Sequence, residues 1–102
     1  MTKEISVWFV IFLLAGCGNS ELQFALIGDN PYGDDNVFKY EKLIEDINSS
    51  DVNWVIHLGD MKNGRSSCSD EKFLSLYELN SKFHMPFVLT PGDNDWFDCR
   101  RE

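Results

Sequence analysis

The chain has 102 residues, 43% of them hydrophobic and 25% charged. This composition is ordinary for one globular domain, and the length is too short for two. Its formal net charge of −8 argues against a nucleic-acid partner, because binding to phosphate backbones depends on clustered Lys and Arg. The acidity has two explanations that are compatible with each other. It keeps the protein soluble, or several of the ten Asp residues bind cations.

The N-terminus is predicted to be a targeting segment. Residues 5–15 form an apolar run broken only by Ser6. This run is shorter than the roughly 20 residues that span a bilayer, but it is typical of a signal peptide. It ends in Leu14-Ala15-Gly16-Cys17, which resembles a bacterial lipobox and implies cleavage before Cys17 and lipid attachment to its thiol. A plain secretory signal with an incidental Cys is the alternative.

This prediction divides the chain into three parts: a lipoprotein signal peptide (1–16), a lipidated Cys with a short tether (17–21) and one domain (22–102). It implies an exported protein, anchored to a membrane through Cys17 and facing the periplasm or the cell exterior.

Hydrophobic periodicity in the domain predicts the order β-α-β-α-β. Strands are expected over 22–27, 52–58 and 87–89, and helices over 37–48 and 70–83. In the first helix, the inward positions are Val37, Tyr40, Leu43, Ile44 and Ile47. In the second helix, they are Phe73, Leu76, Tyr77 and Phe83. Near-continuous apolar strands separated by helices predict an α/β fold with a parallel sheet and helices packed on its faces.

Each predicted strand runs into a Gly-Asp pair, which places Asp29, Asp60 and Asp93 at equivalent positions. Ligands of open α/β sheets gather at the carboxyl ends of the strands, and neighbouring strands lie about 4.8 Å apart. Three carboxylates that close repel one another unless cations bind, and hard divalent metals accept carboxylate oxygens. The pattern therefore predicts a shared metal site, with three coincidental turns as the alternative.

Three segments carry a family resemblance: Ile27-Gly28-Asp29, His57-Leu58-Gly59-Asp60 and Pro91-Gly92-Asp93-Asn94-Asp95. They resemble the first three motifs of the calcineurin-like metallophosphoesterases, usually Asp-x-His, Gly-Asp and Gly-Asn-His-(Asp/Glu). The resemblance implies the N-terminal half of that layered sheet fold and two divalent metal ions. It also implies a small phosphoester substrate, a mono- or diester, hydrolysed by metal-activated water. Asp29 would bind one metal and Asp60 would bridge both.

Two positions depart from the family pattern. Pro31 occupies the place of the first-motif His, and Asp93-Asn94 replaces the usual Asn-His. Asp93 is still expected to bind metal. Asn94 and Asp95 are the predicted catalytic residues, although an Asn amide can hold a phosphate oxygen without acting as a proton donor near neutral pH.

The remaining metal ligands of the family are His residues in later motifs. This chain contains only His57, expected to pack against the sheet, and His84, expected to contact solvent. Its last residue, Glu102, closely follows the third motif. We therefore expect the chain to be the N-terminal portion of a longer protein.

Cys68 and Cys99 follow the second and third motifs. Export would allow them to form a disulfide that ties two loops of the site together. The alternative is that both remain buried thiols.

The leading functional hypothesis is a lipid-anchored, incomplete metallophosphoesterase. The alternative is a non-catalytic, lipid-anchored metal-binding or structural module. A nucleotide-binding α/β domain is a weaker third hypothesis, because the chain has no Gly-x-Gly-x-x-Gly loop.

Overall fold

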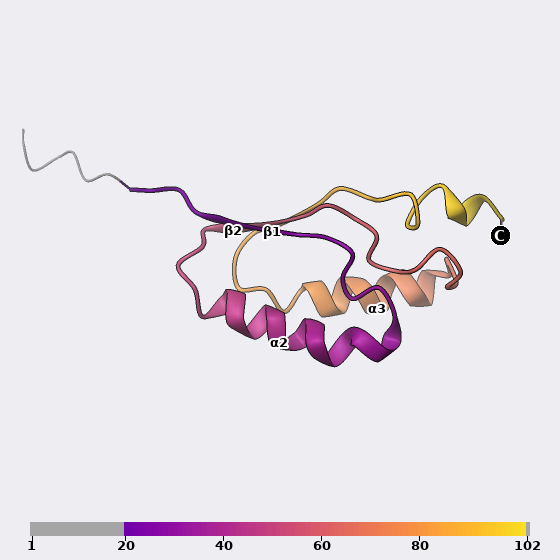
Figure 1. Cartoon of the computed structure of the whole chain (residues 1–102), viewed down its shortest axis with the longest axis horizontal. Coiled ribbons are helices and arrows are strands. Elements are labelled where there is room, and N and C mark those ends of the chain that lie inside the picture. Colours follow the sequence, from indigo (N-terminus) through magenta and orange to yellow (C-terminus); the bar gives the residue numbers. More distant parts are fainter. Residues whose placement is uncertain (1–19, 102) are drawn as a thin grey trace, which may run out of the picture.

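The computed structural model describes residues 20–101 (Figure 1). Its elements in chain order are β1 (Phe24–Ile27), the short 3-10 helix η1 (Asp34–Asn36), α2 (Val37–Asn48), β2 (Trp54–His57), α3 (Asp70–Asn80), β3 (Phe87–Leu89) and the 3-10 helix η2 (Asp98–Arg101). The predicted signal peptide and Cys17 lie outside the described residues. Within residues 20–101, no helix combines the length and apolar character needed to cross a membrane.

The three strands form one parallel sheet in the order β1-β2-β3. Ile56 of β2 pairs with Leu26 of β1 on one side and with Val88 of β3 on the other. Because both crossovers advance in the same direction and are right-handed by preference, α2 and α3 lie on the same side of the sheet (Figure 1). The predicted α/β fold with a parallel sheet is confirmed.

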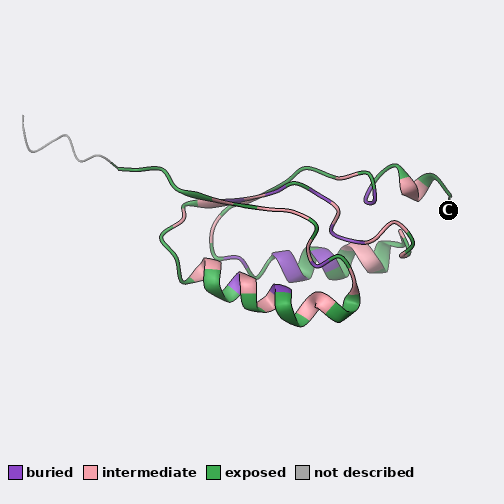
Figure 2. Ribbon diagram, viewed as in Figure 1, coloured by how far each residue is buried: buried purple, intermediate pink, exposed green. Residues whose placement is uncertain are grey.

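The core lies between the two helices and the sheet (Figure 2). Strand residues alternate, so Val55 and His57 face the helices and are fully buried. On the opposite face, Phe24, Leu26 and Val88 remain exposed. The buried apolar cluster consists of Tyr40, Ile44, Val55, Leu79 and Phe83.

The inward face of α2 is as predicted, because Tyr40 and Ile44 are buried and the other three apolar residues pack against the core. One prediction for α3 is wrong: Tyr77 is 72% exposed. The helix turns Leu76, Leu79 and Asn80 inward, which are neighbours at helical spacing, and Tyr77 projects about 100° away from Leu76.

Helix α3 begins and ends at clear local signals. Ser69 precedes it, and its Oγ accepts a hydrogen bond from the Lys72 N–H at 3.2 Å. Asp70 and Glu71 in the first turn stabilise the helix, because their negative charges lie at the positive end of its dipole. The helix ends at Asn80, three residues before the predicted position.

Candidate metal centre

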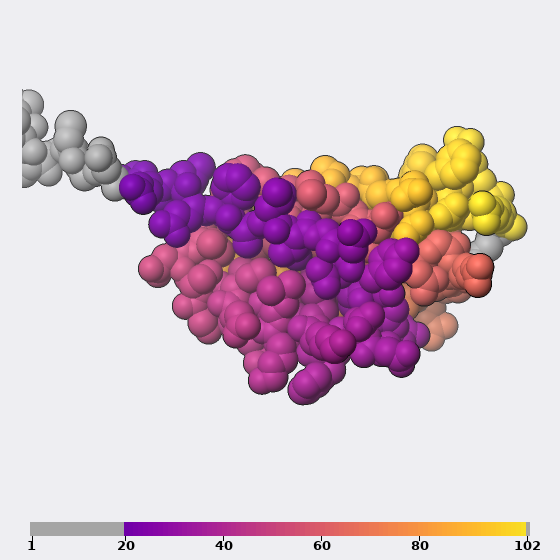
Figure 3. Space-filling model, viewed as in Figure 1, coloured from indigo at the N-terminus to yellow at the C-terminus, as the bar shows by residue number. Residues whose placement is uncertain are grey.

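The three Gly-Asp turns meet at the carboxyl end of the sheet because the strands are parallel. Backbone hydrogen bonds extend the strand pairing into the turns: the Asp29 N–H donates to the Gly59 carbonyl at 3.0 Å, and the Thr90 N–H donates to the His57 carbonyl at 2.9 Å. The loop after β2 and the C-terminal segment lie against each other at this end of the molecule (Figure 3). Because β2 lies between β1 and β3, the turn after β2 is the central one of the three.

The second and third turns approach too closely for any side chain at their glycines. A Cβ added to Gly59, whose φ is 97°, would lie 2.2 Å from the Gly92 nitrogen. A Cβ added to Gly92 would lie 2.2 Å from Asp60 Oδ1. Glycine at both positions therefore brings the Asp60 carboxylate directly over the third turn.

Two of the predicted metal ligands adopt a strained backbone conformation. Asp29 has a φ of 55° and Asp60 a φ of 56°, in the left-handed region that few residues other than glycine adopt. Such outliers cluster at functional sites, where the surrounding structure maintains them. The same strained conformation at both strand ends indicates a functional role for the orientation of the Asp29 and Asp60 carboxylates.

The Asp60 carboxyl lies over the third turn, between Gly92 and the Asn94 N–H, where the Asp93 carboxyl influences it. Burial raises the pKa of the Asp60 carboxyl, and the nearby Asp93 and Asp95 carboxylates raise it further, against a lowering effect of the Asn94 N–H. That N–H donates to Asp60 Oδ1 at 3.0 Å. Burial and the neighbouring carboxylates therefore destabilise the ionised form of Asp60, and a bound cation would stabilise it.

Asp29 does not join Asp60 and Asp93 to make a closed cluster. It is exposed, as is Asp93, whereas Asp60 is half-buried. Across residues 20–101, no three His, Cys, Asp or Glu side chains are grouped closely enough to hold a metal ion. The structure brings two of the three predicted ligands together and leaves the third at the neighbouring strand end.

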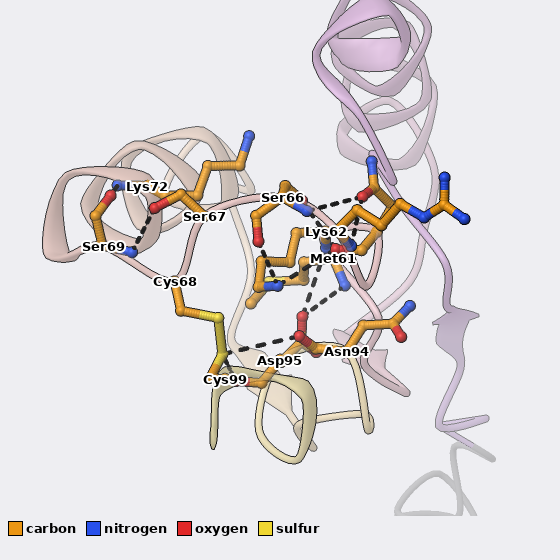
Figure 4. The surroundings of a disulfide bond; sticks show 12 residues. Met61, Lys62, Ser66, Ser67, Cys68, Ser69, Lys72, Asn94, Asp95 and Cys99 are labelled. Carbon is orange, nitrogen blue, oxygen red and sulfur yellow. Dashed lines mark hydrogen bonds between the residues drawn. A yellow bond between two sulfur atoms is a disulfide. The ribbon is translucent and has the colours of Figure 1, made fainter. Parts of the chain in front are cut away.

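Asp95 is buried and acts as a backbone clamp (Figure 4). Its Oδ2 accepts hydrogen bonds from the Asp60 N–H at 2.7 Å and the Gly92 N–H at 3.0 Å. Its Oδ1 accepts from the Met61 N–H at 3.1 Å, with the Lys62 N–H at 3.5 Å. The carboxylate therefore ties the second turn to the third.

His57 connects the first turn to the second. Its Nδ1 accepts a hydrogen bond from the Gly59 N–H at 2.9 Å, so the proton is assigned to Nε2, which lies 2.9 Å from the Asn30 carbonyl oxygen. Both ring nitrogens are therefore engaged with backbone groups. His57 packs beneath the sheet end as expected, and His84 is exposed, also as expected.

Asn94 contacts a residue that sequence reasoning did not single out. It is buried, and its Nδ2 donates to the Tyr32 hydroxyl oxygen at 3.4 Å. The Tyr32 N–H donates to the Met61 carbonyl at 2.8 Å. In the sequence, Tyr32 is marked only by the surrounding Asn-Pro-Tyr-Gly turn residues, which give no indication of a contact 62 residues away.

The loop after β2 is held at two points. A disulfide joins Cys68 to Cys99, with the two Cα atoms 5.6 Å apart, and so links this loop to the segment after β3. Lys62 is 1% exposed, and its Nζ donates to the carbonyls of Ser66 at 3.0 Å and Asn63 at 3.3 Å. Its role in ordering the loop has no signal in the sequence.

Two hollows flank the carboxylates. One, of about 520 Å³, lies beside Asp29 and Tyr32. The other, of about 370 Å³, lies between Asp93 and Trp96, whose side chain is 71% exposed. A ligand therefore has space beside Asp29 and, separately, beside Asp93.

The fold and site define a parallel α/β domain with acidic turns at its strand ends. The family model for the calcineurin-like phosphoesterases matches residues 22–102, and the chain belongs to this family. A comparison with curated proteins and a comparison with solved structures each found no match. The predicted resemblance to the N-terminal part of the superfamily is confirmed.

Proposed function

We propose that the chain is a metal-dependent phosphoesterase domain that hydrolyses phosphate mono- or diesters. The supporting observation is the paired Asp60 and Asp93 carboxyls at the strand ends of a calcineurin-like phosphoesterase chain. Neighbouring ionised carboxylates repel each other, and a bound cation would offset that repulsion.

The carboxylates fit a divalent cation, although they form a pair and not a complete set of ligands. Asp60 and Asp93 would hold the ion, and Asp29 would contribute from the neighbouring turn. When bound, such an ion supplies an activated water and neutralises charge on the phosphoryl group. Carboxylate oxygens suit hard divalent ions such as Mg²⁺ and Mn²⁺.

The other predicted catalytic residues take supporting roles in this proposal. Asn94 acts as a positioning residue, because its backbone N–H donates to Asp60 Oδ1 and its side-chain amide, which carries no dissociable proton at neutral pH, donates to the Tyr32 hydroxyl oxygen. Asp95 is a positioning residue, because its carboxylate accepts the backbone N–H groups that orient Asp60 and Gly92.

A non-catalytic metal-binding module is the second candidate function. It is favoured by the lack of a three-ligand cluster within residues 20–101 and by the amide at Asn94. In that case the chain binds a cation with the same carboxylates and hydrolyses no ester.

Metal binding and turnover need to be measured on the same samples. Mn²⁺ affinity is determined by calorimetry and hydrolysis is followed with aryl phosphate esters, for the unaltered chain, Asp60→Asn and the control Asp98→Asn. Mn²⁺-dependent hydrolysis that is lost in Asp60→Asn and retained in Asp98→Asn supports the phosphoesterase. Mn²⁺ binding without hydrolysis supports the binding module. Failure of the unaltered chain to bind Mn²⁺ refutes both.

We also propose that Cys17 anchors the protein to a membrane, on the strength of the apolar run and the Leu-Ala-Gly-Cys sequence that ends it. Mass spectrometry of the mature N-terminal peptide tests this proposal. A diacylglycerol-modified Cys17 is expected, and a peptide that retains Met1 or carries unmodified Cys17 refutes it.

A further inference from the structure

The wall of the cleft of about 520 Å³ beside Asp29 is formed mostly by residues with polar side chains. We call it the Tyr32–Lys39 cleft, and its lining residues are Asp29, Asn30, Pro31, Tyr32, Asn36 and Lys39. The first turn and the start of α2 form this wall together. Of these residues, only Asp29 is a proposed metal ligand.

Three side chains in the wall have donor groups available. The Tyr32 hydroxyl accepts a hydrogen bond from Asn94 Nδ2 at 3.4 Å, and its own O–H is left to donate elsewhere. Asn36 precedes α2 but makes no side-chain hydrogen bond that caps the helix. Lys39 is exposed and forms no ion pair within the part of the chain that the structure describes.

The position of Tyr32 is set by its backbone. Its φ of 59° lies in the left-handed region, which is uncommon for a bulky side chain. The hydrogen bond from its N–H to the Met61 carbonyl anchors it between the first and second turns, and 42% of the residue remains exposed. A strained, anchored and accessible aromatic residue beside a metal ligand is consistent with a role in ligand binding.

We propose that the Tyr32–Lys39 cleft binds the phosphoryl group of the substrate, with the Tyr32 O–H, the Asn36 amide and the Lys39 ammonium donating to its oxygens. This inference rests on the proposed function, because the acidic turns repel phosphate until a cation lies on them. In a chain of net charge −8, donors and a cation beside the metal ligands create a favourable local site for an oxyanion.

Inorganic phosphate is the probe, titrated by calorimetry into the 102-residue chain saturated with Mn²⁺. Tyr32→Phe should weaken phosphate binding about tenfold, because it removes one hydrogen bond to a charged group. Lys39→Gln should weaken it about threefold, and less at high salt. The matched controls are Tyr77→Phe and Lys42→Gln, which replace exposed residues outside the cleft and should bind phosphate as the unaltered chain does.

The outcomes separate this inference from the proposed function. Phosphate affinity that is equal in Tyr32→Phe and Tyr77→Phe, or no phosphate binding by the Mn²⁺-loaded chain, overturns the inference. Hydrolysis of aryl phosphates without dependence on Tyr32 or Lys39 overturns the inference and leaves the proposed function intact. Phosphate binding that depends on both residues, without hydrolysis of any ester, supports the cleft and refutes the phosphoesterase.

Discussion

The clamp formed by Asp95 gives the sharpest test of how this site is built. In Asp95→Asn, one of the two acceptor oxygens becomes an NH₂ group that faces backbone donors. If Oδ2 is kept, the Asp60 and Gly92 N–H groups retain an acceptor and the Met61 and Lys62 N–H groups lose theirs. Turning the amide over exchanges the two pairs.

The expected cost is a large fraction of the stability of the domain. Hydrogen bonds to charged groups contribute about 1.5–3 kcal/mol each. When Oδ2 is kept, the substitution removes the 3.1 Å bond from Met61 and the long 3.5 Å bond from Lys62, and the two remaining bonds have a neutral acceptor in place of a charged one. We therefore expect the free energy of unfolding to fall by about 3–5 kcal/mol, against a total of about 5–15 kcal/mol for a typical domain. Relief of repulsion with Asp60 opposes this loss, but Asp95 is the smallest of the causes that raise the Asp60 pKa.

Urea unfolding followed by tryptophan fluorescence measures the effect. With a slope of about 1–3 kcal/mol/M, the midpoint should fall by about 2 M. The control is Asp98→Asn, which loses only a 3.6 Å ion pair with Arg101 and should change stability by less than about 0.5 kcal/mol. If Asp95→Asn unfolds at the same urea concentration as the unaltered chain and loses only turnover, the clamp reasoning is refuted and Asp95 acts in the chemistry.

Three further perturbations test other parts of the site. Replacing Cys68 and Cys99 together by Ser should lower the free energy of unfolding by about 3.7 kcal/mol, because the disulfide spans a sequence separation of 31; a urea-measured loss below about 1 kcal/mol would contradict this. The raised pKa of Asp60 means that the folded chain binds this proton more tightly than the unfolded chain, so the contribution of this group to stability without metal is fully present below its unfolded-state pKa and is lost as pH rises through its folded-state pKa. Asp60→Asn should therefore raise the melting temperature of the metal-free chain at pH 7 and flatten its pH dependence, whereas an unchanged or lower melting temperature would count against the repulsion. Gly59→Ala should cost about 3 kcal/mol or more in urea unfolding, because its Cβ would meet backbone at 2.2 Å, and Gly28→Ala, where the nearest atom is at 3.4 Å, should cost much less; equal losses would be inconsistent with the close approach of the turns.

Local pattern was enough to predict the secondary structure and the acidic turns. The 37–48 helix has the predicted bounds, since its apolar spacing is a property of consecutive residues. The three Gly-Asp pairs could be assigned to one sheet edge because parallel strands end on the same side. The exposure of Tyr77 was missed because helical spacing allows two adjacent faces, and only packing against the sheet selects one.

The different roles of the side chains within the site depend on tertiary structure. In the sequence, the carboxylates of Asp29, Asp60, Asp93 and Asp95 look similar. Only the fold places Asp60 near Asp93 and surrounds Asp95 with backbone N–H groups. The Tyr32 hydroxyl reaches Asn94 across 62 residues for the same reason. The types of residue that the chain brings to its strand ends follow from composition and spacing. Which of them repel, clamp or stay available depends on distances between segments that no local pattern contains.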